Sequence, residues 1–510
     1  MSQSRREDGG RSGKILVVAE ARTSGEPTGV VTAEREPPAG APRAGERRRA
    51  IRGRRAAAIA GVLVLALVLR LGYVVVTPGY TIVDDARDYD HHAVSIAAGD
   101  GYALLGPGPT RETAFRPPGY PYFLAGVYRL GGRAWLRSPA RVVAGRIANA
   151  LVGTAIVALL GLLSVQLFGR RVALVAMALA AVYLPLILAG GALMSEPLFA
   201  ALLLAALAAA VRFRRSVHRW RWVALAGILG GLAILTRANA AILLLPLALA
   251  VWDVRPRWSW RALAPPAVLV AVAAAAVAPW TVRNAVELHA FVPVSTQLGT
   301  ALAGTYNDQA RADTRNPATW RSLRRVPELQ YLVRTSAWRR TPEATLERRL
   351  REVSLRFIAD HPGYVPRVVF WNTARALDLA GLTWSRHTYS TVSVTPGWAD
   401  AGVVVFWLFA LLAIAGALTR RARRIPVHVA AVPALLWLSV VFTAFETPRY
   451  RTGIDPFVVL LAALALVAGW DAVRSGSTAG PARRPRSGST ATYTGSATGR
   501  PGRGTGSRPA

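Results

Sequence analysis

The sequence contains no cysteine and a single lysine, Lys14, among its 510 residues. Without cysteine no disulfide can form, so any extracytoplasmic segment must be held together by packing alone. The lack of lysine makes nearly every basic residue an arginine, which reflects codon usage rather than chemistry. Acids are also scarce: 28 Asp and Glu stand against 62 Lys and Arg, which gives a formal net charge of +34.

A charge of this size in a soluble protein would indicate nucleic-acid binding. Here the arginines gather in the two tails and in short loops between hydrophobic runs, as the positive-inside rule describes for membrane proteins. Hydrophobic residues make up 52% of the chain, a high share for a soluble protein. We therefore expect a membrane protein and no nucleic-acid partner.

Several hydrophobic runs approach the roughly 17–25 residues that a membrane-spanning helix needs. They predict an all-α polytopic fold with about ten or eleven spanning helices. The runs are Ala56 to Thr77, Val142 to Phe168, Val172 to Gly191, Leu198 to Val211, Val223 to Leu235, Ala238 to Trp252, Ala262 to Pro279, Gly402 to Leu418, Pro426 to Phe445 and Ile454 to Trp470. The first run is longer than the roughly 7–15 apolar residues of a signal peptide and follows a long polar segment, so we expect it to remain as an anchor.

The distribution of loop arginines predicts the orientation and the domains. Residues 1–50 and 471–510 have a polar, Gly-, Ser- and Arg-rich composition that predicts disordered cytoplasmic tails around a membrane domain at 51–470. The segment from Gly119 to Gly131 is shorter than a membrane-spanning helix needs to be, so we expect a juxtamembrane helix there. This assignment places both termini in the cytoplasm and leaves the first loop, 78–140, and a large segment, 281–400, on the outer face.

The large outer segment has its own helical pattern. Thr341-Pro342-Glu343 is typical of a helix start, and apolar residues then recur at helical spacing as far as Phe357. We expect one helix ending near Asp360 and another over about 365–379.

The first outer loop is rich in acids, with Asp84, Asp85, Asp88 and Asp90. On a helix beginning near Asp84, the side chains of Asp85, Asp88, Tyr89 and His92 fall on one face. A carboxylate there could remove a proton from an acceptor hydroxyl, which is general-base catalysis. The alternative is that these acids solvate an exposed turn or cap a helix.

His91 and His92 stand beside these acids and raise the alternative of a divalent metal site. Adjacent residues point to different sides of a helix, so at most one of them shares the face of Asp85 and Asp88. A surface or hydrogen-bonding histidine is the expectation, and we expect neither a metal nor a cofactor.

Four arginines lie at the outer ends of predicted spans, where the positive-inside rule disfavours them: Arg237, Arg283, Arg449 and Arg451. Guanidinium groups bind phosphate in a bidentate manner. Pairing with Glu196, Glu446 or Asp455, or contact with lipid headgroups, is the alternative. Glu196 itself could bind a sugar hydroxyl, orient an arginine or cap a helix.

Aromatic residues near the predicted interfaces admit two interpretations. Trp280, Trp371, Trp384 and Trp398 could stack on a sugar, but anchoring in the aromatic belt accounts for most of them.

Taken in order, the motifs resemble those of the GT-C membrane glycosyltransferases, in particular the bacterial glycosyltransferase family 39 group related to protein O-mannosyltransferases and to the aminoarabinose transferases of lipid A. The resemblance covers about Ala56 to Trp470. The motifs are Asp85 four residues before Tyr89, Gly99-Asp100-Gly101-Tyr102, Arg116-Pro117-Pro118-Gly119-Tyr120-Pro121, Ser195-Glu196-Pro197-Leu198-Phe199, Leu235-Thr236-Arg237, Pro279-Trp280-Thr281-Val282-Arg283-Asn284, Pro293-Val294-Ser295-Thr296, and Arg449-Tyr450-Arg451 before Asp455-Pro456.

The resemblance implies a GT-C fold and an inverting transfer of a sugar from a polyprenyl-phosphate carrier to an acceptor on the outer face of the plasma membrane. Asp85 matches the family's catalytic aspartate. The chain has Asp84-Asp85-Ala86 where an Asp-Glu pair is commoner, so Asp84 remains a second candidate for the base. The residues expected to bind sugar or phosphate are Asp88, Tyr89, Arg116, Glu196, Arg237, Arg283, Arg449 and Arg451.

Mannose is the sugar that the resemblance favours, but arabinose, galactose or another pentose would use the same frame, and the acceptor stays open among glycan, lipid and protein. A polytopic transporter or lipid flippase is the alternative from another class. Such proteins commonly place charges near the bilayer midplane and carry internal repeats. Here the acids gather at outer helix ends, and Arg70, the clearest charge inside a predicted span, lies in its outer third.

Overall fold

The computed structural model describes residues 44–104, 111–252, 259–333, 341–442 and 448–478. The chain divides into two units, 1–56 and 57–510, and the architecture below is that of the second. Most of the predicted tails, at 1–43 and 479–510, lie outside the described residues. Their inner ends are helical, because the first helix begins at Ala44 and the last reaches Thr478.

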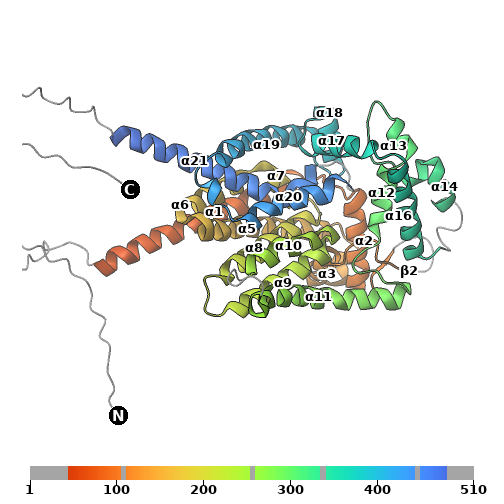
Figure 1. Cartoon of the computed structure of the whole chain (residues 1–510), viewed down its shortest axis with the longest axis horizontal. Helices are drawn as coiled ribbons and strands as arrows, with labels where there is room; N and C mark the ends of the chain where they lie inside the picture. Colours follow the sequence, from red (N-terminus) through yellow and green to blue (C-terminus); the bar gives the residue numbers. More distant parts are fainter. Residues whose placement is uncertain (1–43, 105–110, 253–258, 334–340, 443–447, 479–510) are drawn as a thin grey trace, which may run out of the picture. The chain divides into compact units, whose positions relative to one another are not determined.

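The described residues are almost entirely helical (Figure 1). The helices of the membrane region are α1 (Ala44–Val76), α5 (Ala140–Phe168), α6 (Arg170–Val182), α7 (Leu184–Gly191), α8 (Glu196–Phe213), α9 (Arg219–Thr236), η1 (Ala238–Leu243), α10 (Leu244–Val251), α11 (Trp260–Leu288), α19 (Pro396–Ala417), η3 (Ala422–Arg424), α20 (Val427–Val441), η4 (Pro448–Gly453) and α21 (Asp455–Thr478).

The remaining elements build the two predicted outer regions. The first holds α2 (Asp84–Ala98), α3 (Gly119–Leu130), α4 (Gly132–Leu136) and a two-residue antiparallel pair, β1 (Ala103–Leu104) with β2 (Arg111–Glu112). The second holds α12 (Gln297–Thr305), α13 (Asp308–Ala312), η2 (Leu323–Arg325), α14 (Pro327–Val333), α16 (Glu343–Asp360), α17 (Tyr364–Ala376) and α18 (Leu382–Ser390). Helices α16 and α17 confirm the two helices predicted there.

Six of the described helices are long and apolar enough to cross a membrane: the stretches 52–76, 140–168, 196–213, 261–288, 396–417 and 455–475. Helices α6 and α7 make a seventh span if they are counted together, and the apolar stretches 238–251 and 427–441 are shorter. The polytopic all-α class is therefore confirmed, whereas the count of ten or eleven spans stays a prediction.

The run predicted as one span over 172–191 is bent by 57° between α6 and α7. Pro185 lies in the first turn of α7 and has no N–H to continue the helical ladder, so the chain extends at Tyr183 and starts a new helix. The guanidinium of Arg70, which is fully buried, donates to the carbonyls of Ala180 and Ala181 beside this break. Arg70 thus satisfies backbone groups that the bend leaves without helical partners.

The predicted end of another span at Pro279 is wrong, because α11 continues through this proline to Leu288. Small residues let α9 pack closely on α11: a Cβ atom on Gly227 would lie 2.7 Å from the carbonyl oxygen of Leu269. A second glycine, Gly231, meets α11 one turn further along. Close backbone approach of this kind is typical of helix pairs in membranes.

The buried core has two main parts and two small satellites. One main cluster lies among the spanning helices, and the other joins α2, α3 and α7 to Trp280 and to residues 389–403. The satellites lie within the second outer region. Glu343, at the start of α16, accepts hydrogen bonds from the hydroxyls of Thr113 and Thr296 and from the N–H of Ala114. This carboxylate therefore fastens the second outer region to the first loop.

Candidate active site

Helix α2 presents the acids of the first loop. It begins after the extended residue Val83, with Asp84 and Asp85 in its first turn, where negative side chains are favourable. It ends at Gly99, whose φ of 97° lets its N–H reach back to the carbonyls of Ser95 and Ile96. The helix thus follows the sequence prediction, and it fixes Asp85, Asp88 and Tyr89 on the side that meets Arg116.

Arg116 lies between β2 and α3 and pairs with two of these acids. Its Nη2 atom is 2.5 Å from Oδ1 of Asp85 and 2.6 Å from Oδ2 of Asp88, and its Nε atom is 3.1 Å from the same oxygen of Asp88. The hydroxyl of Tyr102 donates to the carbonyl of Arg116 at 2.9 Å and so holds the backbone of this loop. The guanidinium also lies 5.5 Å from the ring centre of Tyr89.

Arg449 reaches Asp85 from the opposite end of the sequence. It lies in the short helix η4, and its Nη2 atom donates to Oδ2 of Asp85 and to the hydroxyl of Tyr450. Both carboxylate oxygens of Asp85 are therefore occupied by guanidinium groups. The side chains of Asp85, Arg116 and Arg449 are 17%, 10% and 13% exposed.

Burial alone would raise the pKa of Asp85. The positive charges of Arg116 and Arg449, together with their hydrogen bonds, outweigh that effect and hold the pKa well below its ordinary value. Asp85 is therefore an ionised, doubly paired carboxylate at neutral pH.

Glu196 and Arg237 form a third ion pair beside these residues. Nη1 of Arg237 is 2.8 Å from Oε1 of Glu196 and 3.4 Å from the hydroxyl of Ser195, which is 3.2 Å from the hydroxyl of Tyr89. Nε of Arg449 is 3.8 Å from the same oxygen of Glu196. Three arginines from distant parts of the chain thus surround a small group of carboxylates.

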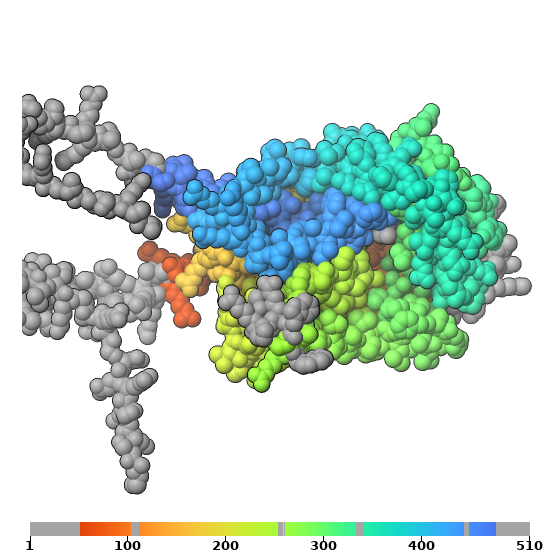
Figure 2. Space-filling view, viewed as in Figure 1, coloured from red at the N-terminus to blue at the C-terminus, as the bar shows by residue number. Residues whose placement is uncertain are grey.

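A cavity of about 1040 Å³ is lined by Asp85 and by all three of these arginines. The charged part of its lining comes from α2, the Arg116 loop, Arg237 and η4. Its apolar wall includes Leu244 of α10 and four residues of α11: Val270, Ala273, Ala274 and Val277. These four span two helical turns, about 10 Å along a membrane-spanning helix. Figure 2 shows the surface hollowed between the green and blue segments, near the position of α2 in Figure 1.

The cavity brings together most of the predicted site residues, namely Asp84, Asp85, Asp88, Tyr89, Arg116, Arg237 and Arg449. Glu196 adjoins them through Arg237. Asp84 is exposed and has a φ of 42°, a left-handed conformation that Asp tolerates better than most residues. It lies on the same cavity as Asp85 but without the two guanidinium partners, which keeps both acids as candidates for the base.

Two predicted arginines do not line this cavity. Arg283 pairs with Glu112 of β2 and donates to the carbonyls of Thr113 and Tyr102, so it fastens α11 to the first loop. Arg451 is buried and pairs with Asp378 at 3.0 Å and Asp455 at 3.2 Å. Pairing with Asp455 was the alternative weighed for this arginine, whereas the other acid considered, Glu446, lies outside the described residues.

His92 packs away from the cavity. Its Nδ1 atom is 3.1 Å from the carbonyl oxygen of Ala103, and its ring stacks on Tyr102 with ring centres 4.5 Å apart. Burial lowers its pKa to about 4. Among the described residues, no group of three or more His, Asp or Glu is arranged to hold a metal ion.

Sequence reasoning missed several residues of the cavity wall. Trp320, Thr388 and Tyr450 line it, and the ring of Tyr450 contacts the guanidiniums of both Arg237 and Arg449, each 4.9 Å from its centre. The position of Tyr450 between two singled-out arginines was a usable signal. Trp320 and Thr388 lie in the second outer region, where no motif marks them.

Residues 115–282 match the family model described as dolichyl-phosphate-mannose-protein mannosyltransferase. This match confirms the resemblance to the GT-C glycosyltransferases. It covers the loop of Arg116, the start of α8 with Glu196, and Arg237. No curated protein matches the chain.

Solved GT-C structures are similar to the chain only remotely. One is the archaeal oligosaccharyltransferase AglB from Archaeoglobus fulgidus, in complex with an inhibitory peptide and a dolichol-phosphate. The two sequences are 15% identical, the match covers 84% of this chain and 52% of that chain, and the TM-score is 0.49. Another is ArnT from Cupriavidus metallidurans bound to undecaprenyl phosphate: 17% identity, 85% and 82% coverage and a TM-score of 0.38. The chain thus spans about half the length of the archaeal enzyme.

Proposed function

We propose that the protein is an integral membrane glycosyltransferase that takes a sugar from a polyprenyl-phosphate carrier. One observation carries this proposal: a large cavity combines four arginines and several carboxylates with an apolar wall along a membrane-spanning helix. Arginines suit a phosphate, and the wall suits an isoprenoid chain. The description of the matching family, which names a dolichyl-phosphate-linked mannose, supports a donor of this class and favours mannose as the sugar.

The proposed reaction is an inverting displacement in which Asp85 is the general base. Asp85 accepts the proton of an acceptor hydroxyl, and the acceptor oxygen forms a bond to the anomeric carbon from the face opposite the phosphate. The bond between that carbon and the phosphate oxygen breaks, and the electron pair leaves with the lipid phosphate. The growing negative charge on the phosphate is stabilised by Arg116, Arg449 and Arg237.

The double pairing of Asp85 gives this mechanism a condition. A carboxylate held by two guanidiniums is a weak base, so Arg116 and Arg449 must turn at least partly towards the donor before Asp85 can accept a proton. The donor phosphate supplies the competing negative charge. Donor binding would therefore raise the basicity of Asp85 at the moment when the base is needed. Asp84 is the alternative base if Asp85 serves only to hold the arginines.

We place the active site on the outer face of the plasma membrane and both termini in the cytoplasm. The support is the distribution of arginines: the short loops around Arg170, Arg214 and Arg421 then lie inside. The acceptor, whether glycan, lipid or protein, would approach through the side of the cavity formed by the second outer region.

The bent pair α6 and α7 bears on the transporter alternative, because broken helices commonly form substrate sites in transporters. Here Arg70 occupies the carbonyls at the break, and neither Arg70 nor Tyr183 lines the large cavity. The break therefore gives no support to a transported substrate.

The test uses purified protein in nanodiscs with a panel of radiolabelled polyprenyl-phosphate sugars, with and without EDTA. Release of sugar to an acceptor or to water, saturable in one donor, is the expected result. Failure to bind or cleave any lipid-linked sugar would contradict the proposal, and movement of an intact lipid across the bilayer would favour the flippase.

A further inference from the structure

The segment 113–118, which carries Arg116, has neither helical nor strand structure of its own. Its buried backbone groups therefore need partners from elsewhere in the chain. The hydroxyl of Tyr102 donates to the carbonyl of Arg116, and the guanidinium of Arg283 donates to the carbonyl of Thr113. The place of Arg116 thus depends on side chains that lie far from it in the sequence.

Glu343 of α16 supplies two further partners for this segment. Its Oε2 atom accepts from the hydroxyl of Thr113 at 2.6 Å, and its Oε1 atom accepts from the N–H of Ala114 at 3.0 Å. Oε1 also accepts from the hydroxyl of Thr296 at 2.6 Å, and the N–H of Thr296 donates to the carbonyl of Ala114 at 3.0 Å. These four residues form a closed ring of hydrogen bonds that joins three separate segments.

The ring lies directly behind the wall of the large cavity. Phe115 and Arg116 follow it in the first loop and line the cavity, and so do Ser295 and Gln297 on either side of Thr296. The four residues of the ring are not part of that lining. They are therefore placed to act on the cavity through their neighbours and not by contact with a ligand.

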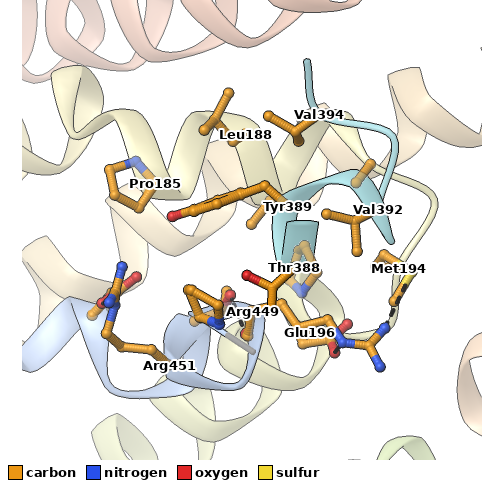
Figure 3. Close-up of a pocket in the computed structure, with 16 residues that line it drawn as sticks. Pro185, Leu188, Met194, Glu196, Thr388, Tyr389, Val392, Val394, Arg449 and Arg451 are labelled. Atoms are coloured by element: carbon orange, nitrogen blue, oxygen red, sulfur yellow. Dashed lines mark hydrogen bonds and ion pairs between the residues drawn. The ribbon is translucent and has the colours of Figure 1, made fainter. Parts of the chain in front are cut away.

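The two arginines that hold Asp85 are supported differently. Arg449 lies on the short helix η4, with its guanidinium beside Met194 and Glu196 (Figure 3). Arg116 leaves from a segment without regular structure, and the proposed mechanism requires its side chain to turn from Asp85 towards the donor. During that movement only the backbone fixes where the guanidinium can reach, and a misplacement of about 1 Å is enough to impair catalysis.

We propose that Glu343 is a positioning residue for Arg116. It holds the backbone from which the guanidinium turns between Asp85 and the donor phosphate, and so makes the second outer region part of the phosphate site. Thr113 and Ala114 are 0% exposed, so removal of the carboxylate leaves their donors without partners unless the segment shifts. The inference rests on the proposed function and gives a role to a residue that the sequence marked only as part of a helix start.

The experiment is a double-mutant cycle between Glu343→Ala and Arg116→Ala. The dissociation constant of undecaprenyl phosphate is measured in nanodiscs for the wild type, both single variants and the double variant, together with each melting temperature. Glu347→Ala is the matched control, because Glu347 lies one turn further along α16 and pairs with Arg351 of the same helix. Thr113→Val keeps nearly the same shape without the hydroxyl, and it replaces Glu343→Ala in the cycle if that variant does not fold.

We expect Glu343→Ala to weaken binding by about tenfold when Arg116 is present, and by less than about twofold once Arg116 is alanine. A role in stability alone would instead weaken binding by the same factor in both backgrounds. The affinity of Glu347→Ala should stay within about twofold of the wild type.

Three results would overturn the inference: an equal loss of affinity in both backgrounds, an unchanged affinity in Glu343→Ala, or a loss in Glu347→Ala as large as that in Glu343→Ala. The same criteria apply to Thr113→Val. A wild-type protein that binds no polyprenyl phosphate would instead contradict the proposed function itself, and the inference with it.

Discussion

Two arginines of the short helix η4 stand two residues apart in the sequence and lie in different surroundings. Arg449 pairs with Asp85 at the wall of the large cavity, where both side chains keep 13% and 17% of their surface exposed. Arg451 pairs with Asp378 and Asp455 in the interior, where the three side chains are 0–3% exposed. The first network lines the large cavity, and the second does not.

The difference shows that pairing between arginine and carboxylate can have two roles, one that holds the backbone in place and one that keeps guanidinium groups ready for a ligand. The buried network joins the end of α17, the turn η4 and the start of α21, and it also includes the hydroxyl of Tyr183, which bonds to Asp455. It thereby fixes the backbone that carries Arg449. The network at the cavity instead keeps its guanidiniums available, because a phosphate can replace the carboxylates that hold them. The substitutions of Asp85, Arg451 and Arg449 test this separation.

The largest effect is expected from Asp85→Asn. The amide keeps nearly the same shape but cannot act as a base, so the turnover number should fall by about 10³-fold or more, as measured with the preferred lipid-linked sugar. Folding and membrane insertion should persist. Asp88→Asn, which also alters a partner of Arg116, should cost much less activity. Normal turnover of Asp85→Asn, with loss in Asp84→Asn, would move the base to Asp84.

Arg451→Ala should lower the stability of the protein and not only its catalytic activity. It leaves the carboxylates of Asp378 and Asp455 buried without their charge partner, which destabilises a protein by about 3–5 kcal/mol. A large fall in melting temperature, or loss of the monodisperse protein in detergent, is the expected outcome. Arg386→Ala is the control, because the Arg386–Asp400 pair is exposed to solvent and should contribute little to stability. Equal melting temperatures for both variants would refute the structural role of Arg451.

Arg449→Ala should have the opposite profile, with a modest change in melting temperature and a loss of ligand affinity. Removing a charge-assisted hydrogen-bond donor should weaken the binding of polyprenyl phosphate by about 10- to 100-fold and lower the turnover number as well. Binding isotherms with undecaprenyl phosphate in nanodiscs measure the first effect. Arg87→Ala serves as the control, since Arg87 is an exposed residue of the same cavity. Unchanged affinity in Arg449→Ala would remove this arginine from the phosphate site.

A separate effect concerns the pH dependence of stability. Burial lowers the pKa of His92 from 6.5 to about 4. Between these two pH values the imidazole is therefore protonated in the unfolded chain but neutral in the folded protein. The stability should be full above pH 6.5 and decline as the pH falls towards 4, by up to about 3 kcal/mol. Asp85 contributes stability that is fully present well above its ordinary pKa of 3.8 and is lost as the pH falls through and below that value, because the unfolded chain then binds a proton while the folded carboxylate stays ionised.

Melting curves of the wild type and His92→Gln across pH 4–7 would measure this contribution, since the amide does not titrate. The difference in melting temperature between the wild type and His92→Gln should become smaller as the pH falls. A gap that stays constant would mean that His92 keeps an ordinary pKa and is more exposed to water than its stacking on Tyr102 indicates.

Much of the fold follows from local properties of the sequence. Long apolar runs predicted the spanning helices, and the helix-start pattern before Glu343 predicted α16. The bend after α6 and the continuation of α11 through Pro279 were not foreseen, although prolines marked both places. A proline removes one N–H in either case, and whether the chain breaks or continues depends on what the neighbouring helices offer to the freed carbonyls.

The sequence by itself determined the class of protein, the acid-rich helix of the first loop and the residue types of the site, because each depends on composition or on spacing within a few turns. The tertiary structure alone decided which arginine meets which acid. Arg449 and Asp85 are 364 positions apart, and nothing local separates the role of Arg449 from that of Arg451. Ion pairing depends on distance and burial in three dimensions, so only the packing of η4 against α8, α17 and α21 could assign one arginine to the cavity and the other to the core.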